Sequence, residues 1–237
     1  EKEKYFDDLE FYQSKLKELN KQYEEFIAKN EKTESQAKNW VELKDLKKIN
    51  NDYRKEIVSR NLLKRDKINN KEFDLIQKYL VSSLYTLQAP VRLNFAGMKI
   101  IREKSKDNDK DNFLYVKGRN NKFFIFNDFK TNKKMGKIEQ KVNPQLNKII
   151  NLFLKFNKSN NFLLSKNGGP LTANALSKYI TRTFKIKDKK ITLNLIRHIY
   201  ISDKIDIKKL KELEEQKAQL AESMHHGSDM QKDYAKI

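Results

Sequence analysis

The segment Leu84-Tyr85-Thr86-Leu87-Gln88-Ala89-Pro90-Val91-Arg92 lies where one sequence pattern ends and another begins. Before it, apolar residues recur every three or four positions, which predicts a helix from about Lys71 to Leu87. We expect this helix to end before Pro90, because proline disfavours helical backbone in the preceding residue. After it come short apolar runs bounded by turn-rich segments, and these predict strands at 98–101, 113–116, 123–126 and 137–142.

Beyond these strands the spacing of apolar residues becomes helical again. Thr172 and Thr192 have side chains suited to capping the N-terminus of a helix. The predicted helices of this part cover 144–154, 172–184, 192–203 and 208–224. Together, the elements predict a mainly helical α+β fold with a small antiparallel β-sheet.

The N-terminal third is predicted to be entirely helical. Between Tyr5 and Phe26, apolar residues alternate at spacings of four and three, which is the heptad pattern of a coiled coil. Three heptads form only a marginal coiled coil, so packing within the chain and pairing with a second chain both remain open. A second helical pattern covers 40–57, and the charged segment 64–70 lacks periodicity. We therefore place a domain boundary there, between a helical domain at 1–66 and a mixed domain at 71–237.

Charge is the strongest compositional signal. The chain has 51 Lys and Arg against 32 Asp and Glu, a formal net charge of +19. Such an excess predicts a polyanionic partner, and nucleic acid fits best because the charge is spread along the chain among Tyr and Phe. A genome biased toward Lys and Asn codons is the alternative explanation of the charge.

Several classes of protein are excluded or disfavoured. The chain has no Cys, which excludes disulfides, thiolate zinc sites and a cysteine nucleophile, and we expect no structural metal. No apolar run approaches the roughly 20 residues that a membrane-spanning helix needs, and the segment Glu1-Lys2-Glu3-Lys4 does not have the character of a signal peptide. We expect no membrane partner.

The residues able to perform chemistry gather near the C-terminus. All three histidines, His198, His225 and His226, lie within the last 40 residues. The first of them ends the segment Asn194-Leu195-Ile196-Arg197-His198, at a predicted helix start, and Tyr234 follows the histidine pair. This clustering indicates a functional site.

These segments resemble the motifs of the tyrosine recombinases, the phage-integrase-like family. That family has a box of the form His-x-x-Arg-His, then a Gly-His pair and a nucleophilic Tyr about nine residues further on. Here 194–198 resembles the first box, and Met224-His225-His226-Gly227 followed by Tyr234 resembles the second. The variants found in large DNA viruses, virophages and eukaryotic mobile elements look most similar.

The upstream half of the chain is similar to the family as well. The segment 84–92 resembles the family's first arginine box, an Arg at the end of an early helix, which would be Arg92. The segment 126–131 ends a predicted strand, where the family places its catalytic lysine on a β-hairpin, and this indicates Lys130 rather than the neighbouring Lys122, Lys133 or Lys134. The resemblance covers 71–237, and it extends to the N-terminal helices by position alone.

The resemblance implies a site-specific recombinase or integrase that cuts and rejoins DNA strands. Tyr234 would attack phosphorus and form a 3′-phosphotyrosyl link, which conserves the bond energy, so no cofactor and no metal is needed. Arg92 and Arg197 would hold the nonbridging oxygens with planar guanidinium forks. Lys130 would protonate the departing 5′ oxygen. His226 would hydrogen-bond the phosphate in the transition state.

Three further residues have less direct roles. His225 replaces His226 if the register shifts by one residue, and His198 is expected to support the site through hydrogen bonding. Asn194 occupies the position at which the family usually has His or Lys, and an amide binds a phosphate oxygen but exchanges no proton. We interpret this as an active enzyme with altered proton transfer from Tyr234.

The resemblance also implies partners: double-stranded DNA, held between a DNA-binding domain at 1–66 and a catalytic domain at 71–237, and further protomers assembled on it. The location of the protein stays open, with an intracellular place in a host nucleus or with a virus fitting the resemblance. The alternatives are a type IB topoisomerase that relaxes DNA, a catalytically silent DNA-binding protein of the same fold, and a structural coiled-coil protein suggested by 5–26.

Overall fold

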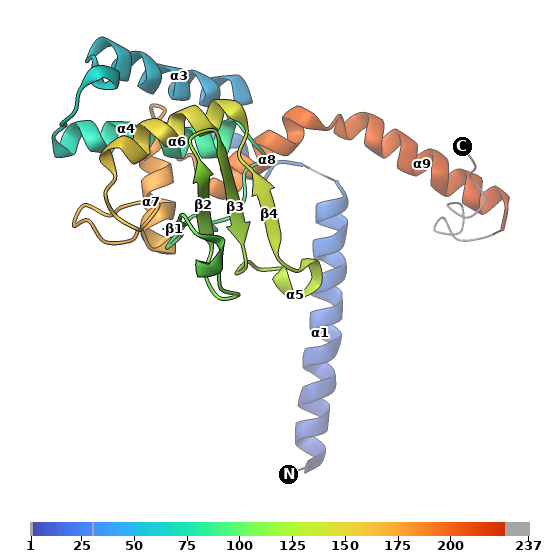
Figure 1. The fold of residues 1–237 in the computed structure, drawn as a ribbon. Coiled ribbons are helices and arrows are strands. Elements are labelled where there is room, and N and C mark those ends of the chain that lie inside the picture. The colour runs from blue at the N-terminus through green and yellow to red at the C-terminus, as the bar shows by residue number, and fades with distance from the viewer. Residues whose placement is uncertain (1, 30, 226–237) are drawn as a thin grey trace. The chain divides into compact units, whose positions relative to one another are not determined.

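The computed structural model describes residues 2–29 and 31–225, and Figure 1 labels most of its helices and strands. Contacts within the chain divide it into two compact units, Glu1–Asn39 and Trp40–Ile237. Unit 1 holds helices α1 (Lys2–Ala28) and α2 (Glu34–Asn39), so the heptad segment is helical as predicted. Unit 2 holds every other described element, including a four-stranded sheet.

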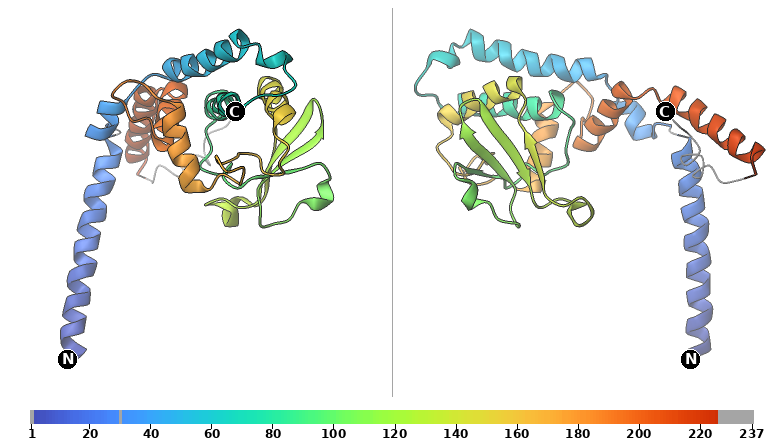
Figure 2. Two further views of the ribbon diagram at one scale, coloured as in Figure 1. Left: turned by 90° about the vertical axis from the view of Figure 1, so that its left-hand side faces the viewer. Right: turned by 45° about the vertical axis from the view of Figure 1, so that its right-hand side comes forward.

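Unit 2 is built around helix α4 (Asn70–Thr86), which has twelve buried residues. Its N-terminus is fixed by a reciprocal capping box: the Asn69 side chain accepts a hydrogen bond from the Glu72 backbone, and the Glu72 carboxylate accepts one from the Asn69 backbone. In the left view of Figure 2, α4 is seen nearly end-on, surrounded by the helices that contact it: α3 (Leu43–Ser59), α6 (Pro144–Phe156) and α7 (Ala173–Thr183).

The C-terminal helices agree with the predicted caps. The Thr172 hydroxyl accepts a hydrogen bond from the Ala175 backbone at the start of α7. The Thr192 hydroxyl accepts one from the Leu195 backbone at the start of α8 (Leu193–Lys204). Helix α9 (Ile207–Ser223) follows, and it corresponds to the predicted charged helix. The helix predictions for this part of the chain are confirmed.

Helix α3 packs on α4 and belongs to unit 2. The amide of Asn50 on α3 donates hydrogen bonds to the hydroxyls of Ser82 (2.8 Å) and Ser83 (2.7 Å) on α4, inside the contact. The division found from contacts therefore falls after Asn39 and not at the segment 64–70, where the sequence predicts a boundary. A 3-10 turn at Leu62–Lys64 lies at the start of that segment. The functional division into a DNA-binding part at 1–66 and a catalytic part at 71–237 stays a prediction.

The predicted strands are present, but one pairing differs from the expectation. The sheet has the order β1 (Lys99–Ile101), β2 (Phe113–Gly118), β3 (Asn121–Phe126) and β4 (Ile138–Lys141). Strands β2, β3 and β4 pair antiparallel, with Phe124 opposite both Leu114 and Gln140. Strand β1 runs parallel to β2, so the prediction of an antiparallel sheet is wrong for this pair.

The physical reason lies in the connection between β1 and β2. Parallel neighbours need a long crossover, whereas antiparallel neighbours join through a short turn. Residues 102–112, with a 3-10 turn at Lys104–Lys106, provide enough chain to return to the same end of the sheet. Beside them, the Lys99 backbone N–H donates to the Asn112 carbonyl (3.0 Å), which fixes the parallel register.

The sheet packs on the helices through aromatic side chains. Leu114, Phe124 and Phe126 belong to the main core, where the Phe124 ring lies 6.0 Å from that of Phe162. The alternate residues of the same strands form a smaller cluster on the other face, composed of Ile101, Phe113 and Ile125 with Tyr115 against it. This alternation follows from the two-residue period of a strand. The connection after β3, with its helix α5 (Asn132–Met135), lies at the edge of unit 2 (Figure 1).

A buried lysine joins the sheet to helix α6. Lys122, on β3, is only 1% exposed. Its ammonium donates hydrogen bonds to the side-chain oxygens of Asn147 (2.9 Å) and Asn151 (2.6 Å) and to the carbonyl of Arg119 (2.6 Å). None of these partners carries a negative charge, and burial lowers the pKa of the Lys122 ammonium below its usual 10.5.

We expect Lys122→Met to lower the free energy of unfolding by about 3 kcal/mol, because the carbonyl and amide oxygens lose a charged donor while buried. The pH dependence has a definite sign. The pKa of Lys122 in the folded state lies below its usual 10.5. Between these two pKa values the unfolded chain binds more protons than the folded chain, so Lys122 makes the free energy of unfolding rise as the pH approaches 10.5. Chemical denaturation of both proteins across this range checks the difference. Exposed Lys117→Met is the control, and equal stability of all three proteins would contradict the prediction.

Candidate functional site

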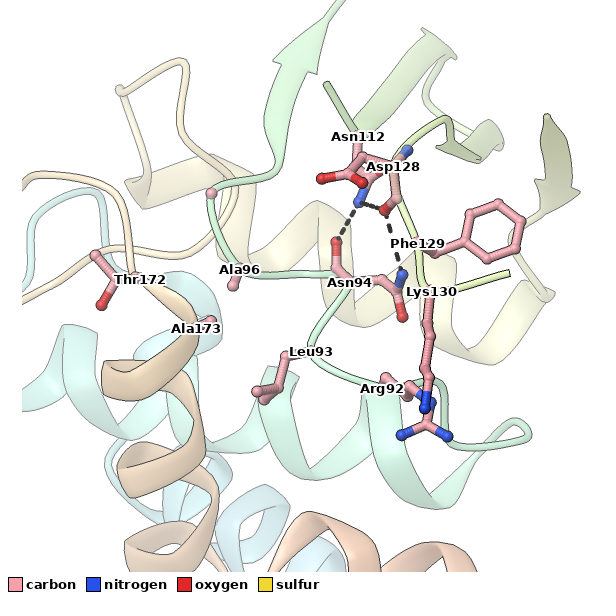
Figure 3. Close-up of a pocket in the computed structure, with 11 residues that line it drawn as sticks. Arg92, Leu93, Asn94, Ala96, Asn112, Asp128, Phe129, Lys130, Thr172 and Ala173 are labelled. Carbon is pink, nitrogen blue, oxygen red and sulfur yellow. Dashed lines mark hydrogen bonds between the residues drawn. The ribbon is translucent and has the colours of Figure 1, made fainter. Parts of the chain in front are cut away.

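An open pocket of about 470 Å³ lies where four backbone segments of unit 2 meet (Figure 3). The segments are the chain after α4, the connection after β3, the first turn of α7, and the end of the loop before β2. Arg92 comes from the first, Lys130 from the second, and Thr172 with Ala173 from the third. Two of the predicted catalytic residues, far apart in sequence, thus line one pocket.

Arg92 lies in the segment that follows α4, and its backbone is anchored to the core. The hydroxyl of Tyr85, a fully buried residue, donates a hydrogen bond to the Arg92 carbonyl (3.2 Å). Further along, the Gly97 backbone donates to the Leu171 carbonyl (2.9 Å), just before α7. Gly97 has a φ of +63°, which a side chain would strain. The segment is held at both ends, while the Arg92 side chain itself is exposed.

Lys130 lies four residues beyond the end of β3. The preceding Phe129 packs against the main core, and the buried Asn127 amide donates to the Asp107 carboxylate (2.9 Å) and the Asp111 carbonyl (2.9 Å). The Asn127 carbonyl accepts a hydrogen bond from the Asn132 amide (2.9 Å) at the start of α5. These contacts fix the backbone on both sides of Lys130, whose own side chain is exposed.

The side chain of Asn112 connects the Arg92 segment to the Lys130 segment. Its amide donates hydrogen bonds to the carbonyls of Asn94 (3.1 Å) and Asp128 (2.9 Å), and its oxygen accepts from the backbones of Asn127 (2.9 Å) and Asp128 (2.9 Å). We call these hydrogen bonds the Asn112 bracket, and Figure 3 shows two of them above the side chains of Arg92 and Lys130. One amide therefore holds the two loops together, so Arg92 and Lys130 are positioned by the fold.

The pocket is suited to an anion. In Figure 3 the Lys130 side chain runs toward that of Arg92. Within residues 2–29 and 31–225, neither cationic group has a hydrogen bond or an ion pair. The N-terminus of α7, the positive end of a helix dipole, lines the same pocket. Asp128 also lines it, so the local excess is two cations over one carboxylate.

A second group of predicted residues lies together on α8. Asn194, Arg197 and His198 share one side of this helix, because residues three and four positions apart are neighbours on a helix surface. The Asn194 amide nitrogen and His198 Nε2 are 3.4 Å apart, and both side chains are exposed, whereas Arg197 is half-buried. None of the three lines the pocket of Arg92 and Lys130. The convergence of both arginines on one phosphate therefore stays a prediction.

The remaining predicted residues are near or beyond the last described position. His225 has a φ of 55°, the left-handed conformation common at the end of a helix, two residues past α9. His226 and Tyr234 lie outside the described residues. The roles predicted for these three residues stay predictions.

Sequence reasoning did not identify the residues that build the bracket. Asn112, Asn127 and Asn94 lie in loops of an asparagine-rich chain, where a single Asn has no distinguishing pattern. The one available signal was their position: Asn112 directly precedes β2, and Asn127 directly follows β3, so the antiparallel pairing brings them together.

The chain matches no family model, no curated protein and no solved structure. Among the described helices, none combines the length and apolar content that crossing a bilayer requires. In the described part of the chain, no group of three or more His, Asp or Glu side chains is arranged to hold a metal ion.

Proposed function

We propose that the chain is a tyrosine recombinase that cleaves and rejoins DNA through a 3′-phosphotyrosyl intermediate. The observation that supports this best is the shared pocket of Arg92 and Lys130, two unpaired cations from distant segments joined by the Asn112 bracket. The helical fold with a small sheet is consistent with the catalytic domain of this class. The double-stranded DNA partner and the assembly of several protomers on it belong to the same proposal.

The chemistry assigns one step to each residue. The Tyr234 hydroxyl loses its proton to solvent, its oxygen attacks phosphorus and forms a P–O bond, and the bond to the 5′ oxygen breaks with its electron pair. Lys130 donates a proton to that leaving oxygen, since an alkoxide is a poor leaving group. Arg92 forms two parallel hydrogen bonds to nonbridging oxygens, whose negative charge grows during attack. Rejoining reverses these steps, with the 5′ hydroxyl as nucleophile.

Strand cleavage by this site requires helix α8 to lie close to the bound phosphate. Arg197 must reach the same phosphate as Arg92 when DNA is bound, with His198 supporting it and Asn194 accepting or donating a hydrogen bond at the phosphate. Helix α7 contacts α8, and its N-terminus lines the pocket, so this pair of helices links the two groups of residues. His226, or His225 in the shifted register, would complete the site.

The test is incubation with nicked suicide DNA, followed by denaturing gel analysis. We expect the wild-type chain to give a protein-linked DNA band and Tyr234→Phe to give none, because phenylalanine has no nucleophilic oxygen. Tyr200→Phe, on a half-buried tyrosine of α8, is the matched control and should retain the band. An adduct that persists in Tyr234→Phe would assign the nucleophile elsewhere.

Two other outcomes would identify other functions. Relaxation of supercoiled DNA with an adduct but without recombinant products would indicate a type IB topoisomerase. Salt-dependent DNA binding with no adduct would indicate a catalytically silent DNA-binding protein, the possibility that Asn194 favours because an amide cannot exchange a proton.

A further inference from the structure

Helix α1 carries a straight row of exposed apolar side chains. Leu9, Tyr12, Leu16, Leu19 and Tyr23 follow each other at spacings of three and four. Their side chains are between 51% and 68% exposed. A repeat of 3.5 residues keeps such a row on one side only if the helix supercoils around a partner, so the spacing is that of a coiled-coil seam.

Unit 1 itself provides no cover for this row. Its other helix, α2 (Glu34–Asn39), has six residues and no buried side chain. In proteins, most of the stability of a helix comes from the packing of its apolar face and not from helix propensity. A partner that buries the seam would therefore stabilise α1.

The charge of α1 differs from that of the rest of the chain. Residues 2–28 contain five Lys against seven Asp and Glu, a net charge of −2, while the whole chain has +19. A helix of this charge is repelled by DNA phosphates, so it is a poor candidate for a DNA contact. Its partner is expected to be a protein surface.

The residues beside the seam are suited to a second copy. The flanking positions are Asp8, Gln13, Lys15, Asn20 and Gln22, of which only two are charged, with opposite signs. Lys15 already pairs with Glu18 of its own helix (2.7 Å). Two α1 helices can therefore approach without like-charge repulsion, and the apolar row is complementary to itself because each layer brings Leu or Tyr against Leu or Tyr.

We propose that α1 pairs with α1 of a second copy of this chain in a two-stranded coiled coil. This association does not depend on DNA, and it goes beyond the proposed strand cleavage. It would deliver protomers in pairs, before any assembly on a DNA site. The other possible occupants of the seam, unit 2 of the same chain or an unrelated protein, predict a monomer for the purified chain.

The first experiment measures the molar mass of the full chain without DNA, by sedimentation equilibrium. We expect a dimer for the wild type, and a dissociation constant raised roughly 100-fold or more by Leu16→Lys, because the dimer loses two buried leucines and gains two charges at the seam. Ser14→Lys adds the same charge on the opposite side of α1 and should keep the wild-type mass. A monomeric wild type, or equal association of the two variants, would overturn the proposal.

Crosslinking gives a second, independent readout. The chain has no native Cys, so an introduced thiol reports only on its own position. In a parallel pair, oxidation of the Leu16→Cys variant should join two chains through position 16. In an antiparallel pair, a mixture of the Leu16→Cys and Leu19→Cys variants should give the crosslinked product. Ser14→Cys should not crosslink, and absence of both seam products would overturn the proposal. The Leu16→Lys variant should still form the covalent DNA adduct, so failure of the dimer and failure of the proposed cleavage are distinguishable.

Discussion

Replacing Arg92 with lysine is expected to slow covalent adduct formation roughly 100-fold, and replacing it with alanine roughly 1000-fold. Lysine keeps the positive charge but loses the planar fork that holds two phosphate oxygens at once. Arg92 is exposed, and its guanidinium has no partner among the described residues. Both variants should therefore unfold at the wild-type temperature, so that the loss reports on the reaction alone.

The measurement is single-turnover cleavage of nicked suicide DNA at saturating protein, which separates the rate from DNA affinity. Arg102→Ala is the matched control, an exposed arginine in the segment after β1 that does not line the pocket. It should change the rate less than about threefold, since it removes one surface charge and no phosphate contact in the site. If Arg92→Ala cleaves as fast as this control, the pocket is not the site of phosphoryl transfer.

Local signals in the sequence were sufficient for most of the elements. Thr172 and Thr192 begin helices because their side chains satisfy backbone N–H groups that the helix cannot, and this requirement is readable from the residue type and the pattern after it. The strands were readable in a similar way, because the short apolar runs at 113–116 and 123–126 are bounded by turn-rich segments.

The pairing of β1 with β2 was not readable from local signals. Its direction is set by the path of residues 102–112, a polar segment with neither helical nor strand periodicity. The path is held by contacts between distant residues, such as the ion pair of Lys104 with Glu139 on β4 (2.8 Å). Only the folded chain specifies such contacts.

The candidate site could also be predicted only in part from the sequence. The motifs indicated Arg92 and Lys130 individually, and the fold places both at one pocket. The means of placing them, an asparagine side chain that bonds to both loops, has no sequence pattern of its own. The arginine on α8 and the tyrosine at position 234 could be indicated by motif, but their approach to the pocket depends on the arrangement around a DNA phosphate.

Lys130→Ala should slow cleavage of ordinary DNA by roughly 10²–10⁴-fold, the range expected for loss of a general acid. The exposed Lys133, on α5 and outside the pocket lining, provides the matched control. Replacing it with alanine removes the same single positive charge, only three residues further along the chain. Lys133→Ala should cleave within a few-fold of wild type. An equal loss in both variants would mean that the nearby positive charge matters and that no single lysine delivers the proton.

The proton-transfer role itself is separated by changing the leaving atom. A substrate with sulfur in place of the bridging 5′ oxygen departs as a thiolate, and the pKa of a thiol, about 8.5, lies far below that of an alcohol. Such a leaving group needs no general acid, so Lys130→Ala should cleave it within roughly tenfold of the wild-type rate. Arg92→Ala should remain slow on the same substrate, because charge still develops on the nonbridging oxygens. If the sulfur substrate fails to restore Lys130→Ala, Lys130 binds the phosphate without donating the proton, and the general acid is another residue.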